Sequence, residues 1–174
     1  MKKIIILLIL IFAGIFGRNF LFNSFFRYEI IKEREMYSLK NKHDVQYRNN
    51  GDVEDIINEN LKETASALSF SFDPCASDPN ILMETKKANC IGYSAFFAAS
   101  LHNRLEEQGL DDDWSVSHEV GEIYFLNENI NAYFKSKFFK DHDFVVVKNR
   151  KTKETIAVDP ALYDYFRIDK IIVK

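Results

Sequence analysis

The chain has little cysteine, glycine or proline and no surplus of positive charge. Its two cysteines, among 174 residues, exclude a disulfide-stapled scaffold and an all-cysteine zinc site within one chain. Six glycines and three prolines exclude a collagen-like or linker-like composition. With 23 Lys and Arg against 26 Asp and Glu, the formal charge is −3. This charge argues against nucleic acid as a partner, because phosphate binding needs a basic surface.

What is present is typical of a folded globular protein. Hydrophobic residues make up 47% of the chain and charged residues 28%. The length favours one domain with a substantial core. The 16 Phe and 8 Tyr suit a β-rich core, although an AT-rich genome would enrich the same residues.

The N-terminus has the features of an export signal. Lys2 and Lys3 precede thirteen apolar or small residues, Ile4–Phe16. This run is shorter than the roughly 20 residues of a membrane-spanning helix. No pair of small residues with the spacing of a cleavage site is present, which favours an uncleaved anchor over a cleaved signal peptide. We therefore expect residues 1–26 to be a signal anchor or signal peptide, with the body of the protein outside the cytoplasm, membrane-anchored or secreted.

The segment 27–50 has mixed charged and apolar residues at roughly helical spacing. Its apolar positions are Ile30, Ile31, Met36 and Leu39. The pattern predicts a stalk or a first helix before the main domain.

The segment 51–174 is predicted to be one α+β domain. A helix is expected after Asp52, and a second from Cys90 to about Gln108, where Gly109 occupies the position typical of a helix end. β-branched and aromatic residues then predict three strands, at Ser115–Leu126, Asp143–Lys148 and Thr155–Val158. Helices followed by strands favour a helical layer packed on an antiparallel sheet.

Cys90 is a candidate nucleophile because it lies at the predicted N-terminus of its helix. The helix dipole and the free N–H groups there favour an anion, and therefore the thiolate. Taken alone, a cysteine at the head of an apolar helix is more often a small buried core residue.

The hairpin between the last two strands supplies candidate partners. If Asn149–Thr152 forms the turn, the antiparallel register places His142 directly opposite Asp159 on one face of the sheet. Opposed Cβ atoms lie about 4.5–5.5 Å apart, a gap that a carboxylate–imidazole hydrogen bond can bridge. This pair supplies the base and the orienting carboxylate of a nucleophilic triad.

Three short motifs resemble those of the transglutaminase-like superfamily. Cys90–Ala99 resembles the segment in which a cysteine opens a helix, His142–Phe144 resembles the start of the histidine strand, and Val158–Pro160 resembles the Asp-Pro pair that closes the next strand. The resemblance spans about residues 61–165 in the same order. It implies a papain-related α+β core, with a Cys-bearing helix on an antiparallel sheet and a catalytic triad of Cys90, His142 and Asp159.

The expected function is cysteine-dependent acyl transfer on amide bonds of proteins or peptides. Cys90 would form a thioester, His142 would act as base and Asp159 would orient it; release to water gives a protease or amidase, and release to an amine gives a transglutaminase. No cofactor or metal is expected. The alternative is a non-catalytic domain of the same fold that presents a groove to a protein or cell-wall partner.

Several assignments stay open from the sequence. His118 could replace His142 as base, although no carboxylate is expected opposite it. Cys75 could form a disulfide with Cys90 in an exported protein, which would remove the nucleophile. The backbone N–H of Cys90 is one expected oxyanion donor, and Asn89 or Trp114 could supply the second.

Overall fold

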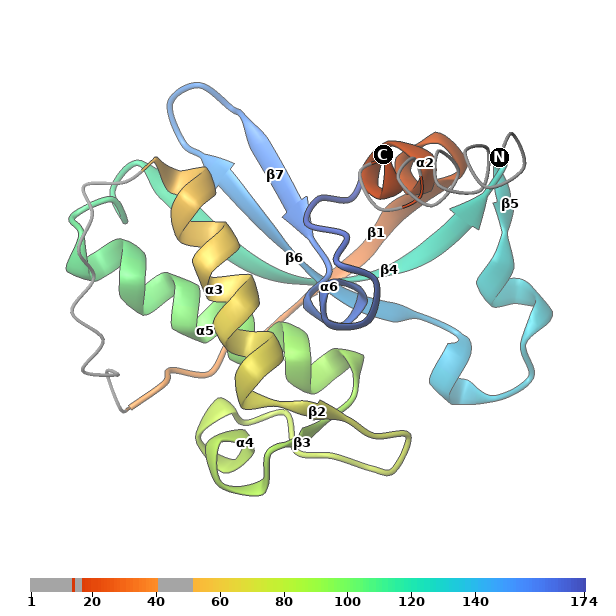
Figure 1. Cartoon of the computed structure of the whole chain (residues 1–174), viewed down its shortest axis with the longest axis horizontal. Coiled ribbons are helices and arrows are strands. Elements are labelled where there is room, and N and C mark those ends of the chain that lie inside the picture. Colours follow the sequence, from red (N-terminus) through yellow and green to blue (C-terminus); the bar gives the residue numbers. More distant parts are fainter. Residues whose placement is uncertain (1–13, 15–16, 41–51) are drawn as a thin grey trace, which may run out of the picture.

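An antiparallel sheet with the two long helices on one face organises residues 14, 17–40 and 52–174, which are those that this computed structural model describes (Figure 1). The protein is therefore of the α+β class. The elements follow the chain in the order α2 (Arg18–Phe25), β1 (Phe26–Arg34), α3 (Val53–Ala67), β2 (Ser69–Phe70), α4 (Pro79–Thr85), β3 (Lys87–Ala88), α5 (Cys90–Glu107), β4 (Trp114–Phe125), β5 (Glu128–Asn129), the 3-10 turns η1 (Ile130–Tyr133) and η2 (Lys137–Phe139), β6 (His142–Asn149), β7 (Thr155–Val158) and α6 (Pro160–Phe166).

The main sheet is curved, and one group of buried side chains lies inside the curve. Its strand order is β1-β4-β6-β7, and the short β5 pairs with the end of β4. The C-terminal residues join the two edges: Ile171 N donates to Ala157 O of β7 at 2.9 Å, and Lys174 N donates to Tyr28 O of β1 at 2.8 Å. The side chains enclosed by the curve are those of Tyr28, Phe144, Val146, Ala157, Ile168 and Ile171. This closure brings β1 close to the β6–β7 hairpin.

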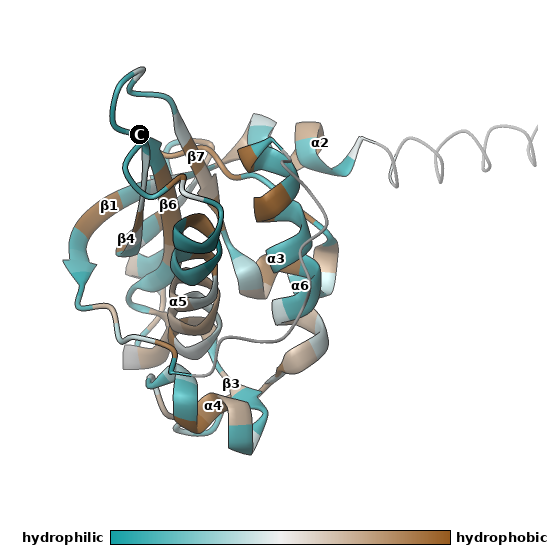
Figure 2. Ribbon diagram, turned by 90° about the vertical axis from the view of Figure 1, so that its left-hand side faces the viewer, coloured by the Kyte–Doolittle hydropathy of each residue, from teal (hydrophilic) through white to brown (hydrophobic). Residues whose placement is uncertain are grey.

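Helix α5 lies between the sheet and α3 (Figure 2). The side chain of Asn89 accepts a hydrogen bond from Gly92 N at 3.3 Å and caps the helix, so that Cys90 is its first residue. Gly109, at φ +67°, ends it as the sequence predicted. The main core is formed by apolar residues of α3, α5, β6 and β7, among them Ile57, Leu61, Phe97, Leu101, Leu105, Val145, Val147 and Val158.

A small lobe that the sequence did not predict packs against the start of α5. It consists of α4 and the parallel pair β2–β3, which lie together below α5 in Figure 1. Its close approach requires glycine at position 92, where a Cβ would lie 2.9 Å from the Cβ of Ala88. The lobe therefore fixes the position of the helix end that carries Cys90.

The segment 27–50, expected to be a stalk or a first helix, instead enters the sheet as β1, and the helix prediction is wrong. β1 pairs with β4 along its length, from Phe26 opposite Phe125 to Arg34 opposite His118. Tyr28 is the one buried residue of β1, so the apolar–polar alternation that marks a half-buried strand is missing. The domain therefore begins before residue 51, and residues 41–50 lie outside the described residues.

The end of the segment 1–26 also belongs to the fold. In α2, Asn23 Nδ2 donates to Lys170 O at 3.0 Å, and Arg18 Nε donates to Arg167 O at 2.6 Å. The remainder, residues 1–13 and 15–16, lies outside the described residues, so the expected export signal stays a prediction. Within the stretches that the structure does describe, no helix combines the length and the apolar character needed to cross a membrane.

The β6–β7 hairpin has a longer loop than predicted, at residues 150–153. Val145 pairs with Val158, so Asp159 does not stand directly opposite His142, and the predicted register is wrong by two residues. Because side chains alternate between faces with a period of two, the shift leaves both residues on one face as diagonal neighbours.

Candidate active site

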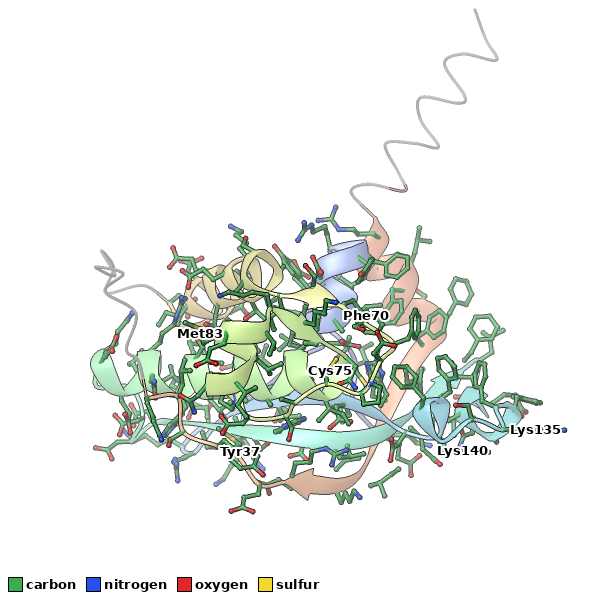
Figure 3. All side chains as sticks on the ribbon, turned by 90° about the horizontal axis from the view of Figure 1, so that it is seen from below. Tyr37, Phe70, Cys75, Met83, Lys135 and Lys140 are labelled. Carbon is green, nitrogen blue, oxygen red and sulfur yellow. The ribbon has the colours of Figure 1, made fainter. Side chains whose placement is uncertain are left out.

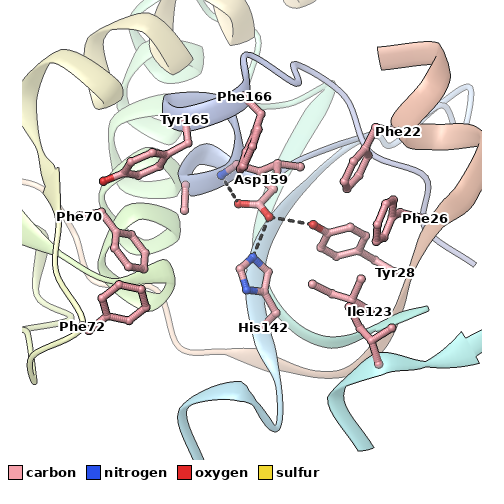
Figure 4. A pocket seen from close by; sticks show the side chains of 13 residues that line it. Phe22, Phe26, Tyr28, Phe70, Phe72, Ile123, His142, Asp159, Tyr165 and Phe166 are labelled. Carbon is pink, nitrogen blue, oxygen red and sulfur yellow. Dashed lines mark hydrogen bonds and ion pairs between the residues drawn. The ribbon is translucent and has the colours of Figure 1, made fainter. Parts of the chain in front are cut away.

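Two of the three residues singled out from the sequence, His142 and Asp159, lie together at the start of β6, and Cys90 begins α5. His142 Nε2 and Asp159 Oδ2 lie 2.7 Å apart (Figure 4). Cys90 is among the groups that raise the pKa of His142. Because Nε2 bonds Asp159, Nδ1 is the ring nitrogen left for another partner. Cysteine, histidine and aspartate are the residue types of a nucleophile, a base and its orienting carboxylate.

Asp159 is held by three hydrogen bonds in a buried position. Its side chain is 1% exposed. Oδ1 accepts from Leu162 N at 2.9 Å and caps α6, while Oδ2 accepts from Tyr28 Oη at 2.9 Å as well as bonding His142. Pro160 begins the helix, a position where a missing N–H costs nothing. The carboxylate is therefore fixed from three sides before any substrate binds.

Burial and the ion pair have opposite effects on the imidazole. Burial lowers the pKa of His142, but the charge and hydrogen bond of Asp159, together with Cys90, raise this pKa well above its usual value. For Asp159, burial raises the pKa, whereas the charge and hydrogen bond of His142, with Leu162 N and Tyr28, bring it below its usual value. The pair is therefore an imidazolium facing a carboxylate at neutral pH.

Tyr28 is a site residue that sequence reasoning missed. Besides bonding Asp159, its ring meets the His142 ring edge-on, with centroids 5.9 Å apart. Burial, followed by the charge of Asp159, raises the pKa of Tyr28 well above its usual value, so the hydroxyl stays a donor. Tyr28 lies on β1. Because this segment was expected to be a stalk or a helix, its pairing with the sheet was not predicted. Its one signal in the sequence was an aromatic residue among charged neighbours.

A second histidine–carboxylate pair lies on the other face of the sheet. His118 Nε2 and Asp143 Oδ1 are 2.9 Å apart, and Arg34 forms an ion pair with the same carboxylate. As expected, no carboxylate stands directly opposite His118, where Val145 pairs with it, but the diagonal neighbour Asp143 supplies a carboxylate partner that the sequence did not predict. Burial raises the pKa of Asp143, but His118 and Arg34 lower it below its usual value. The interactions of Cys90 described above are with His142, which supports His142 as the base.

The cysteines are both free, so the predicted alternative of a Cys75–Cys90 disulfide is wrong. Cys75 Sγ donates to Asp73 O at 3.1 Å in the loop before α4. Figure 3 shows Cys75 on the same side of the molecule as Phe70 and Tyr37. Cys90 is 6% exposed at the start of α5.

One of the two expected oxyanion donors is excluded by its position. Trp114 pairs with Asn149, at the end of β6 away from His142, so Trp114 as a donor is wrong. Asn89 lies beside Cys90, where its side-chain oxygen caps α5.

An apolar pocket of about 440 Å³ opens beside the histidine (Figure 4). His142 and Asp159 form part of its wall. The other lining residues are Phe22, Phe26, Tyr28, Phe70, Phe72, Ile123, Ile130, Ala161, Leu162, Tyr165 and Phe166. A pocket of this size can enclose a small ligand, and its polar groups are concentrated at the candidate catalytic pair.

No group of three or more His, Cys, Asp or Glu side chains that could hold a metal ion is found in residues 14, 17–40 and 52–174. Comparisons of the chain with models of known protein families, with curated proteins and with solved structures found no significant match.

Proposed function

We propose that this protein is a cysteine-dependent acyl-transfer enzyme acting on amide bonds of proteins or peptides, with a transglutaminase-like, papain-related core. The observation that carries the proposal is the hydrogen bond between His142 and Asp159, together with the effect of Cys90 on the pKa of His142. The cysteine at a helix N-terminus supports the same assignment, as does a histidine at the start of β6 bonded to an aspartate directly after β7.

The proposed reaction begins with attack of the Cys90 thiolate on the amide carbonyl carbon. The carbonyl oxygen gains negative charge and is met by N–H groups of the first turn of α5. His142 then transfers a proton to the leaving nitrogen as the C–N bond breaks, which leaves a thioester on Cys90 and a free amine. Water or a second amine attacks the thioester, His142 takes its proton, and the thiolate is released.

We further propose that the enzyme is exported and held at a membrane by its N-terminal segment. The support is the sequence itself, in which Lys2 and Lys3 precede the apolar run Ile4–Phe16. In this arrangement the body, and with it the Cys90 site, lies outside the cytoplasm.

The alternative function, a non-catalytic domain that presents a groove to a protein or cell-wall partner, is favoured by one observation. The rim of the apolar pocket exposes Phe72, Tyr165 and Phe166, with 70%, 60% and 66% of their surface accessible. Exposed aromatic residues of this kind are typical of binding surfaces.

Alkylation of the two cysteines separates the alternatives. With iodoacetamide at neutral pH, Cys90 of the full chain should react at least about tenfold faster than Cys75, because a thiolate beside an imidazolium is the reactive form. His142→Gln should remove this difference. The matched control is His102→Gln, an exposed residue of α5 bonded to Glu106, which should leave it unchanged. Equal, slow labelling of both cysteines in the native protein would support the binding domain.

A further inference from the structure

The apolar pocket beside His142 continues into a second cavity that reaches α2. This second cavity measures about 780 Å³. It shares five aromatic or aliphatic residues with the first, namely Phe22, Phe26, Leu162, Tyr165 and Phe166. Together the two form an apolar groove, called here the α2 groove, that leads from the catalytic pair to the first helix of the fold.

The walls of the α2 groove suit hydrocarbon better than peptide. The rings of Phe22 and Phe26 are stacked, with centroids 4.6 Å apart, and side chains of α2 and α6 continue the apolar surface. Next to His142 the lining contains no charged residue besides His142 and Asp159, and the second cavity adds one, Arg18, whose Nε donates to Arg167 O. A peptide backbone laid there would leave its N–H and C=O groups without partners, which costs free energy for each buried group.

The far end of the α2 groove adjoins an apolar surface. Leu21 and Phe25 line it and keep 47% and 44% of their surface exposed. In the sequence, α2 follows the apolar run Ile4–Phe16 directly. A membrane held by that run would therefore lie next to the open end of the groove.

We propose that the α2 groove binds the hydrocarbon chain of a membrane amphiphile, so that the acyl group presented to Cys90 carries a long alkyl chain. This inference rests on the acyl-transfer chemistry of the proposed function and narrows its amide substrate to one whose acyl group carries an alkyl chain, since only the leaving part can then be peptide. The chain enters past α2, and the reacting carbonyl stops where the groove wall ends at His142 and Asp159. Cys90, which raises the pKa of the same imidazole, attacks the carbonyl there.

A chain-length series of N-alkyl iodoacetamides tests the proposal without knowledge of the substrate. In the reaction the thiolate displaces iodide and forms a C–S bond, so the reagent needs no turnover. The full chain in lipid nanodiscs is treated with reagents from methyl to dodecyl, and both cysteines are followed by mass spectrometry. Each added methylene that enters the groove should speed alkylation of Cys90 by about fourfold, the effect of burying one CH₂. Cys75 corrects for partition of the reagents into the bilayer.

Two variants locate the effect. Phe166→Gln removes an exposed groove residue and should lower the dodecyl-to-methyl rate ratio at Cys90 on the order of fivefold, from lost apolar contact. Tyr133→Gln, at a residue that is 75% exposed and lines neither cavity, should leave the ratio unchanged.

The possible failures are distinguishable. Fast methyl alkylation of Cys90 without any dependence on chain length would overturn the hydrocarbon site and leave the proposed function standing. The same chain-length dependence at Cys75, or no effect of Phe166→Gln, would also overturn it. If the methyl reagent labels Cys90 no faster than Cys75, the proposed function fails, and this inference fails with it.

Discussion

Asp159 has two separable tasks, and a pair of substitutions can divide them. Its carboxylate bonds the imidazole of His142, and the same side chain caps α6 through Leu162 N. Asp159→Asn keeps an oxygen for the cap but replaces the other acceptor by an N–H donor. Asp159→Ala removes both functions and leaves Tyr28 Oη buried without its acceptor. The asparagine variant therefore tests the site, and the alanine variant tests the fold.

The magnitudes follow from the contacts. Loss of an N-cap side chain costs about 0.5–2 kcal/mol of stability, and an orphaned buried hydroxyl costs about 1–3 kcal/mol. Asp159→Ala should thus lose about 3 kcal/mol, which lowers the melting temperature by roughly 10 °C in a chain of this size. Asp159→Asn should lose about 1 kcal/mol, since an amide can still bond both Leu162 N and Tyr28.

Asp159→Asn should change the reactivity of Cys90 more than it changes the stability of the protein. Without the charge and the hydrogen bond of Asp159, the two main causes that raise the pKa of His142 are gone, so this pKa should fall toward or below its usual value. The imidazole then no longer faces Cys90 as an imidazolium at neutral pH. We expect alkylation of Cys90 in Asp159→Asn to slow on the order of 10²-fold, a typical contribution of a positioned acid–base group.

The assay combines thermal unfolding with the alkylation rate of Cys90, measured from about pH 5 to about pH 9, a range that brackets the usual histidine pKa. Asp164→Asn is the matched control, because Asp164 lies on the same helix and bonds Tyr93 instead of His142. A native alkylation profile in Asp159→Asn would refute the orienting role. A native melting temperature in Asp159→Ala would refute the capping role.

Three further predictions follow from the site and the sheet around it. Tyr28→Phe should cost about 1–2 kcal/mol in unfolding experiments and slow Cys90 alkylation by less than about tenfold, because Asp159 keeps its other two partners; a loss as large as that of Asp159→Asn would contradict this. Gly121→Ala should destabilise the protein by about 3 kcal/mol or more, since a Cβ there would lie 2.4 Å from Glu29 O of β1; an unchanged melting temperature would show that the strands separate easily. The raised pKa of His142 predicts a stability advantage over His142→Gln that is complete below about pH 6.5 and lost as the pH rises through the folded-state value; an advantage that grows with pH would reverse the assignment.

Local sequence signals determined the main helices and strands. Asn89 offers a capping side chain, Gly109 tolerates a left-handed backbone, and the residues between them favour a helix, so the bounds of α5 could be predicted almost to the residue. The run Thr155–Val158 forms β7 as predicted, because β-branched residues between turn residues favour extended structure in any context. These signals placed Cys90 at a helix start.

The hairpin shows which part of a register a sequence can determine. The loop is two residues longer than predicted, and it contains Lys153 in a left-handed backbone with φ of 66°, a conformation that the lysine side chain does not indicate. The face on which His142 and Asp159 lie depends only on whether the shift is even or odd. The pairing of imidazole and carboxylate could therefore be predicted although the register was wrong.

The surroundings of the site were decided by the tertiary structure alone. β1 lies on the sheet because it pairs with β4, some ninety residues further along the chain, and its own alternation is too weak to indicate a strand. That pairing acts together with the C-terminal residues that join the sheet edges. As a result, Tyr28 lies against Asp159, and α2 lies beside the apolar pocket. Contacts between distant segments are set by which surfaces pack together after the elements form, and no local pattern of residues records them.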